Sequence, residues 1–170
     1  RGLGDVYKRQ ALGSVETKLS SKLLTVITAG ETLTEDVVRI TRQALNDNVE
    51  FFNDYGPTEA TVFCTLYKID NPGCKIIPIG RPVYNTQIYI LQGTQLCGIG
   101  EPGELCIAGV GIARGYLNRP ELTASKFIRN PFGKGRLYRT GDLARWLSDG
   151  NIEYLGRIDE QVKIRGFRVE

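Results

Sequence analysis

The stretch that decides the fold reads Val49-Glu50-Phe51-Phe52-Asn53-Asp54-Tyr55-Gly56-Pro57-Thr58-Glu59. Its first four residues are mostly apolar and predict a buried strand, which Gly56-Pro57 then ends sharply. The turn brings an amide, an aromatic ring, a hydroxyl and a carboxylate together, a set that suits a nucleotide with its Mg²⁺ ion. The alternative is an ordinary strand-to-helix turn, in which Thr58 and Glu59 only begin a helix.

The residues before this stretch predict a strand and a helix. Residues 23–28 form an apolar run that ends at Ala29-Gly30, which is typical of a buried parallel strand. Thr34 is expected to cap a helix that continues to about Leu45, because apolar residues recur there at helical spacing. Strand, helix and strand in this order predict a right-handed βαβ crossover.

After Thr61 the pattern changes to short alternating or apolar runs separated by turn formers. We expect a β-rich subdomain, either a small barrel or a twisted antiparallel sheet. Its runs are residues 61–69, 87–91, 104–108, 137–139 and 152–155. One helix is expected between them, with Asn118 as its cap, Pro120 in its first turn and residues 122–128 as its apolar side.

These elements predict an α/β fold in three parts. Residues 11–65 would be the end of a βαβ subdomain, residues 66–157 a β-rich, barrel-like subdomain, and residues 158–170 a hinge followed by the first strands of a small C-terminal domain. Residues 1–10 do not match this pattern and resemble a non-native, artefactual segment. The chain begins with Arg1 and contains no methionine, so we expect an internal fragment of a longer protein.

Composition argues against several classes of function. The net charge is +3, and basic residues are interspersed with acids, so no nucleic-acid partner is expected. No apolar run is long enough to span a membrane and no signal peptide is recognisable, which predicts a soluble cytoplasmic protein without a membrane partner. The four cysteines form no Cys-x-x-Cys pair and histidine is absent, which argues against a structural zinc site and against histidine-based nucleophilic hydrolysis. Cys64 and Cys106 are expected to be small buried hydrophobes.

Three further segments have features that bear on nucleotide chemistry. Asp142 follows a glycine turn, and its carboxylate could accept hydrogen bonds from both hydroxyls of a ribose. The alternative is that Asp142 is an ordinary turn residue exposed to solvent. Arg157 could pair with a phosphate or ribose oxygen, or form a surface ion pair. Residues 109–117 are glycine-rich but match neither the Walker loop nor Gly-x-Gly-x-x-Gly, so close backbone packing at a β-turn is the preferred interpretation.

Taken in order, four segments resemble successive core motifs of the adenylation domains of nonribosomal peptide synthetases, within the adenylate-forming enzyme superfamily. These segments are residues 53–59, 103–117, 138–143 and 156–168, and residues 79–82 and 118–123 also fit. The resemblance extends over roughly residues 20–170.

The resemblance implies an ATP-dependent, AMP-forming ligase. The carboxylate of an amino acid would attack the α-phosphate of ATP to give an aminoacyl-adenylate and pyrophosphate. The acyl group would then pass to the phosphopantetheine thiol of a peptidyl carrier domain, with a condensation domain expected in the same chain. An upstream phosphate loop, an amine-binding aspartate and a downstream catalytic lysine have no counterpart here, so the chain alone is expected to be inactive.

The resemblance also implies roles for single residues. The expected nucleotide-binding residues are Gly30, Asn53, Tyr55, Gly56, Thr58, Asp142, Tyr154 and Arg157. Within this set Tyr55 would stack on adenine and Asp142 would take the ribose hydroxyls. Thr58 and Arg157 would contact the nucleotide oxygens and, together with the Mg²⁺ ligand Glu59, form the catalytic group.

The remaining matched positions concern the amino acid and the small domain. The expected amino-acid pocket consists of Ile27, Ala29, Asp54, Val62 and Phe63. A carboxylate at Asp54 would favour a polar or cationic substrate side chain, unless it bonds a nearby backbone turn instead. Asp159 would be the hinge of the small domain, and the loop containing Lys163, Arg165 and Gly166 would swing in for the thioester step.

Two alternative functions remain. An acyl- or aryl-CoA ligase of the same superfamily shares the Tyr-Gly-x-Thr-Glu and Thr-Gly-Asp motifs, but Asn53 and Pro57 favour the peptide-synthetase branch. A non-catalytic module of the adenylate fold would only bind a nucleotide or a partner protein.

Overall fold

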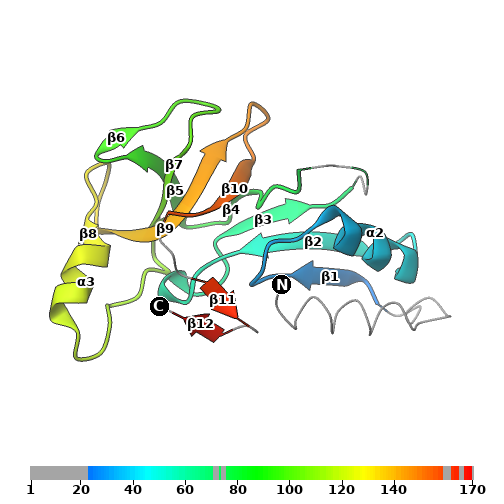
Figure 1. Ribbon diagram of the computed structural model, residues 1–170, viewed down its shortest axis with the longest axis horizontal. Helices are drawn as coiled ribbons and strands as arrows, with labels where there is room; N and C mark the ends of the chain where they lie inside the picture. Colours follow the sequence, from blue (N-terminus) through cyan, green and yellow to red (C-terminus); the bar gives the residue numbers. More distant parts are fainter. Residues whose placement is uncertain (1–22, 71–72, 74–75, 159–161, 165–166, 170) are drawn as a thin grey trace.

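The computed structural model describes residues 23–70, 73, 76–158, 162–164 and 167–169 (Figure 1). Its first sheet has the strand order β1-β2-β3-β4. The strands are β1 (Thr25–Thr28), β2 (Glu50–Tyr55), β3 (Thr65–Lys68) and β4 (Arg81–Pro82). β1 and β2 run parallel, and the other neighbours are antiparallel.

The helix α2 (Glu35–Ala44) connects β1 to β2, which confirms the predicted strand–helix–strand order and parallel pairing. The Thr34 hydroxyl accepts a hydrogen bond from Val37 N at 3.4 Å and caps the helix, as predicted. The negative charges of Glu35 and Asp36 in the first turn interact favourably with the positive end of the helix dipole and stabilise the helix. The inner side of α2 packs with β2 in one core cluster, whose buried members are Leu33, Val37, Val38, Leu45, Val49, Phe51 and Ile69.

The second sheet is antiparallel and has six strands in the order β10-β9-β7-β5-β6, with β8 paired to β9. An antiparallel sheet was one of the two expected arrangements. Its strands are β5 (Thr86–Gln92), β6 (Gln95–Leu96), β7 (Gly103–Gly109), β8 (Phe127–Arg129), β9 (Arg136–Trp146) and β10 (Ile152–Arg157). The largest core cluster includes Ile88, Ile90, Leu105, Ile107, Ala144 and Ile152.

Three local predictions in this half were wrong, and the first two concern β9 and the start of α3. The strand predicted at residues 137–139 is β9, which continues to Trp146, so Asp142 lies inside a strand and not beyond a turn. A bulge allows this, because Gly141 has a φ of 74° and a glycine tolerates that conformation. In the helix α3 (Pro120–Lys126) the N-cap position is Arg119, which makes no side-chain capping hydrogen bond, and not Asn118, which adopts a φ of 55° before the helix begins.

The expected apolar side of α3 was also wrong. No residue of α3 is buried, and the apolar residues Phe127 and Ile128 belong to β8. The short spacing between the helix and this strand explains the error, since a few apolar residues after a helical segment fit either element.

The two sheets are joined where β10 meets the segment before β4. Ile152 N donates to Gly80 O and Ile79 N donates to Ile152 O, both at 2.8 Å. A side chain at Gly80 would collide with the backbone, since an ideal Cβ there lies 2.0 Å from Leu66 O. This junction brings the carboxyl end of β2 beside β9 and β10, which Figure 1 shows at the centre of the molecule.

Three further expectations concern the rest of the chain. The predicted C-terminal hairpin is confirmed by the antiparallel strands β11 (Val162–Ile164) and β12 (Phe167–Val169). Cys64 and Cys106 are buried as predicted, and burial raises the pKa of each thiol to about 12. Within the described ranges, neither helix has the length and apolarity needed to cross a membrane. Residues 1–10 lie outside the described residues, and the predicted domain boundaries stay predictions.

Candidate nucleotide site

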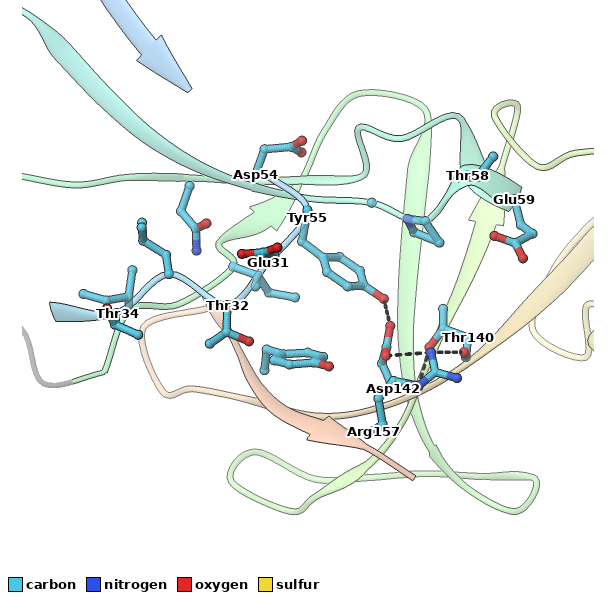
Figure 2. A pocket seen from close by; sticks show the side chains of 18 of the residues that line it. Glu31, Thr32, Thr34, Asp54, Tyr55, Thr58, Glu59, Thr140, Asp142 and Arg157 are labelled. Carbon is cyan, nitrogen blue, oxygen red and sulfur yellow. Dashed lines mark hydrogen bonds and ion pairs between the residues drawn. The ribbon is translucent and has the colours of Figure 1, made fainter. Parts of the chain in front are cut away.

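A cavity of about 570 Å³ lies between the carboxyl end of β2 and the strands β9 and β10 (Figure 2). This volume is within the range of small-molecule sites. The lining residues come from three parts of the chain: residues 30–34, residues 53–59, and a group from the second sheet and the junction, namely Ile77, Ile79, Tyr138, Thr140, Asp142, Tyr154 and Arg157. The predicted nucleotide-binding residues all lie in this lining, and so does the predicted metal ligand Glu59.

Asp142 is the centre of a hydrogen-bonded group in the cavity. Its Oδ2 accepts a hydrogen bond from the Tyr55 hydroxyl at 2.5 Å, and its Oδ1 pairs with Arg157 Nη1 at 3.0 Å. Figure 2 shows these three side chains converging from β2, β9 and β10. Burial, followed by the charge and hydrogen bond of Asp142, raises the pKa of Tyr55 well above its ordinary value, so Tyr55 stays protonated as a donor.

Both ordinary alternatives for this pair were wrong. Asp142 is not a solvated turn residue, because only 6% of its surface is exposed. Arg157 is not in a surface ion pair, since its side chain is 22% exposed and Nη1 also donates to Thr140 O at 3.0 Å. A shielded carboxylate–guanidinium pair of this kind gains more from its contacts than an exposed pair.

Two aromatic rings form one wall of the cavity. The centroids of Tyr55 and Tyr154 are 6.2 Å apart and their planes are tilted by 36°. Asn53 lies beside them, and its Nδ2 donates to Pro78 O at 2.8 Å, which fixes the orientation of the amide. Gly56 contacts the following turn closely, because an ideal Cβ there lies 2.1 Å from Val62 O. Gly30 also lines the cavity, and no atom lies within 4 Å of the position that a Cβ would occupy there.

Glu59 is held at the far side of the cavity by the glycine-rich segment 109–117. Its carboxylate Oε1 accepts a hydrogen bond from the Tyr116 hydroxyl at 2.7 Å, and its carbonyl accepts one from Ala113 N at 2.8 Å. The backbone of this segment packs closely against its neighbour, as predicted. An ideal Cβ at Gly111 would lie only 3.3 Å from Ala60 O. Sequence reasoning missed Tyr116, whose only signal was its place at the end of that glycine-rich segment.

The residues around Glu59 fit a Mg²⁺ ion that is shared with a nucleotide. The described part of the chain has no group of three or more His, Cys, Asp or Glu side chains that could hold a metal by itself. Mg²⁺ usually takes only one or two protein carboxylates and completes its shell with phosphate oxygens and water. Glu59 is 7% exposed and lines the cavity, whereas Thr58 beside it is exposed.

The structure brings together only part of the predicted amino-acid pocket. Asp54 lines the cavity, whereas Ile27, Ala29, Val62 and Phe63 do not and are exposed. Alternation along β2 places Asp54 on the opposite side of the strand from Tyr55, and Figure 2 shows it pointing away from that ring. Of the five residues predicted for the amino-acid pocket, only Asp54 therefore shares the cavity with the Asp142 group, and the pocket as a whole stays a prediction.

Asp54 is a buried carboxyl group with an unsatisfied oxygen. It is 6% exposed, and its Oδ1 has no hydrogen-bond partner among the described residues. The alternative in which Asp54 bonds a nearby backbone turn therefore finds no support at Oδ1. Burial raises the pKa of Asp54 to about 6, so a change of charge is possible near neutral pH.

The other predicted residues belong to the C-terminal hairpin region. Lys163 lies in β11, and its side chain is not described. Asp159, Arg165 and Gly166 lie outside the described residues.

Comparison with known proteins identifies relatives that match most of the chain. The model of the family described as AMP-binding enzyme matches residues 5–117. Tyrocidine synthase 3 of Brevibacillus parabrevis is 55% identical over 87% of this chain, and gramicidin S synthase 1 of Brevibacillus brevis is 54% identical over 86%. The chain spans only 2% and 13% of the lengths of these two relatives.

A solved structure supports the same assignment. An artificially fused adenylation–PCP di-domain of a nonribosomal peptide synthetase from Klebsiella oxytoca superposes with a TM-score of 0.82 at 31% identity. The match covers 99% of this chain and 34% of that one. The predicted fold, a part of the adenylate-forming fold, is confirmed by this likeness.

Proposed function

The chain belongs to the AMP-binding enzyme family, and we propose that it is part of an ATP-dependent adenylation domain of a nonribosomal peptide synthetase. The carrying observation is the Asp142 group, in which a buried carboxylate is held by Tyr55 and Arg157 in a cavity that also contains Glu59. The likeness to the tyrocidine and gramicidin S synthases and to the adenylation–PCP structure supports this proposal.

Each residue has a task in binding ATP. The aromatic wall of Tyr55 and Tyr154 offers a face for the adenine base, because base–aromatic stacking is favourable for every base. Asp142 has the acceptors that a ribose diol needs, and Arg157 supplies a permanent cation beside it. The Asn53 amide, whose orientation is fixed by Pro78, faces the base. The absence of a side chain at Gly30 leaves room for the base beside the backbone.

The chemistry we propose is attack of an amino-acid carboxylate on the α-phosphate of ATP, which forms an aminoacyl-adenylate and releases pyrophosphate. Such transfers depend mainly on positioning and on neutralising charge. A Mg²⁺ ion at Glu59 would offset negative charge on the phosphates. Tyr116 orients the Glu59 carboxylate, and Thr58 is exposed where a phosphate could reach it.

The substrate class we propose is an amino acid with a polar or cationic side chain. The support is Asp54, whose buried Oδ1 lacks a partner among the described residues and would gain one from an ammonium, guanidinium or hydroxyl group. We also propose that the product passes to the phosphopantetheine thiol of a peptidyl carrier domain, with a condensation domain in the same protein. The free thiols of Cys64, Cys97 and Cys106 are consistent with a cytoplasmic location.

Nucleotide binding can be tested on the 170-residue chain by calorimetric titration with AMP. Tyr55→Leu should weaken binding about tenfold, since stacking on an aromatic ring contributes about 1–3 kcal/mol per base. Tyr55→Phe is the matched control, because it keeps the ring and removes only the hydroxyl bonded to Asp142. Absence of AMP binding by the unmodified chain, or equal binding by the Leu variant, would contradict the proposal.

Substrate choice needs a complete adenylation domain. Residues 23–158 can replace the matched segment of tyrocidine synthase 3, and ATP–pyrophosphate exchange can be measured with a panel of amino acids. We expect the highest exchange with polar or cationic amino acids and a loss of that preference in Asp54→Ala. A preference for aliphatic amino acids would refute the role given to Asp54.

A further inference from the structure

We propose that Glu104 is a positioning residue, which holds the backbone bulge at Thr140–Gly141 and thereby directs Asp142 into the cavity. Glu104 lies on β7, outside the lining of that cavity, and its carboxylate bonds Arg139 and Gly141 instead of the predicted nucleotide-binding side chains. The nucleotide part of this inference rests on the proposed function, whereas the part concerning the bulge does not.

The bulge leaves backbone groups without their usual partners in the sheet. Glu104 pairs with Leu143 and Cys106 pairs with Arg139, so the register shifts between these two pairs. Leu105 alone therefore faces Thr140, Gly141 and Asp142. Since a regular antiparallel ladder cannot satisfy three residues with one, other groups must bond the backbone here.

Side chains supply the missing partners. Glu104 Oε1 accepts a hydrogen bond from Gly141 N at 3.1 Å, and Thr140 Oγ1 donates to Leu105 O at 2.6 Å. The Thr140 hydroxyl also accepts from Asp142 N at 2.9 Å. Glu104 is thus the carboxylate that fastens the glycine at the apex of the bulge.

Glu104 is itself held rigidly. Its Oε2 accepts two hydrogen bonds from the Arg139 guanidinium, from Nε at 2.9 Å and from Nη2 at 2.6 Å. The Glu104 side chain is only 12% exposed, so water competes weakly for the carboxylate. Two bonds to a planar guanidinium define the direction of the carboxylate, and its other oxygen is then directed at Gly141.

The backbone of the same bulge is also hydrogen-bonded to the end of β10. Gly141 O accepts a hydrogen bond from Ile158 N at 2.9 Å, and Thr140 O accepts one from Arg157 Nη1 at 3.0 Å. A change in the shape of the bulge would therefore move Asp142 and loosen Arg157 and Ile158 together. Glu104 acts on the site through this shared piece of backbone.

The chain offers a matched control for this role. Glu153 pairs with Arg145 at 2.7 Å, with side chains 12% and 37% exposed, compared with 12% and 45% for Glu104 and Arg139. Both arginines lie on β9, but the Glu153 carboxylate bonds Arg145 and does not bond the backbone of the bulge. Glu104→Ala and Glu153→Ala therefore remove similar ion pairs, and only the first removes the bond to Gly141.

The experiment is amide hydrogen exchange by NMR on the 170-residue chain. Glu104→Ala should accelerate exchange at Gly141 and Ile158 at least tenfold, while Glu153→Ala should change it less than threefold. Glu104→Gln should give an intermediate value, because its amide oxygen can still accept from Gly141 N, and this variant serves if the alanine variant fails to fold. Equal acceleration in the Glu104 and Glu153 variants, or unchanged exchange at Gly141, would overturn the proposal.

Calorimetric titration with AMP tests the functional consequence. We expect about tenfold weaker binding in Glu104→Ala, unchanged binding in Glu153→Ala and partial recovery in Glu104→Gln. Unchanged AMP affinity in Glu104→Ala would overturn the positioning role. If the unmodified chain binds no AMP, the proposed function fails, and the exchange rates still decide whether Glu104 holds the bulge.

Discussion

Asp142 and Asp54 are two aspartates with the same burial and opposite surroundings. Each is 6% exposed, and each lines the same cavity from a different sheet. Asp142 is bonded by Tyr55 and Arg157, whereas Oδ1 of Asp54 has no partner among the described residues. The difference teaches that the partners of a buried carboxyl group, more than its burial, determine what the charge costs the fold.

The local backbone explains the difference. Asp142 follows a bulge in β9 that directs it toward two donors from other strands. Asp54 lies in the regular strand β2, where alternation turns it away from the side of Tyr55. The Asp142 carboxylate, whose charge is balanced by Arg157 and Tyr55, is suited to a permanent structural part of the site. The Asp54 carboxyl group, whose Oδ1 has no such partner among the described residues, is suited to receive its partner from a ligand.

The largest effect is expected from removing the compensated charge. Asp142→Ala should lower the free energy of unfolding by about 3 kcal/mol, because the shielded Arg157 loses its charged partner and the Tyr55 hydroxyl loses its acceptor. Urea denaturation at pH 7 measures this change. Arg39→Ala is the control, since its pair with Asp36 is on the surface and should contribute less than about 0.5 kcal/mol. Similar losses in both variants would remove the contrast between shielded and exposed pairs.

Removing the charge of Asp54 is expected to raise the free energy of unfolding, by an amount that depends on pH. Asp54→Asn should raise the free energy of unfolding at pH 8 by about 2 kcal/mol, since a shift of one pKa unit corresponds to about 1.4 kcal/mol and the buried amide loses part of the gain. The pKa of Asp54 is raised from 3.8 to about 6, so folding is favoured by its protonated form. This contribution is complete below pH 3.8 and is lost as the pH rises through 6.

The measurement is urea denaturation of both proteins at pH 8, 6 and 4. The advantage of Asp54→Asn should shrink steadily and approach zero at pH 4. A pH-independent difference, or a less stable variant at pH 8, would mean that the charge of Asp54 is compensated after all.

The smallest change in stability is expected from removing the hydrogen bond to a third buried carboxylate, that of Glu59. Glu59 is 7% exposed and accepts a hydrogen bond from Tyr116, so Tyr116→Phe should lower the free energy of unfolding by about 1 kcal/mol. The ring packing against Phe127, at 5.5 Å between centroids, would remain. Tyr89→Phe is the control, because its hydroxyl bonds the exposed Gln87 at 3.2 Å. Thermal unfolding should show a larger loss for Tyr116→Phe, and equal losses would contradict the assigned role.

The sequence predicted more of the first sheet than of the second. The order of β1, α2 and β2, the Thr34 cap and the break at Gly56-Pro57 all follow from local patterns, and each is present in the structure. The length of β9 was not predictable in the same way, because Thr140-Gly141-Asp142 is typical of a turn and becomes a bulge only beside β7. Asn118 was misjudged for a similar reason, since a capping residue type can also adopt a left-handed conformation.

By itself, the sequence determined the order of β1, α2 and β2 and the family to which the chain belongs, and it predicted residues that line the cavity. Those features depend on the types of neighbouring residues, and the heptapeptide at residues 53–59 is the strongest of them. Only the tertiary structure decided which of these residues are partners. Tyr55 and Asp142 are 87 positions apart and Glu59 and Tyr116 are 57 apart, so their bonds depend on how the two sheets pack and on where β9 bulges.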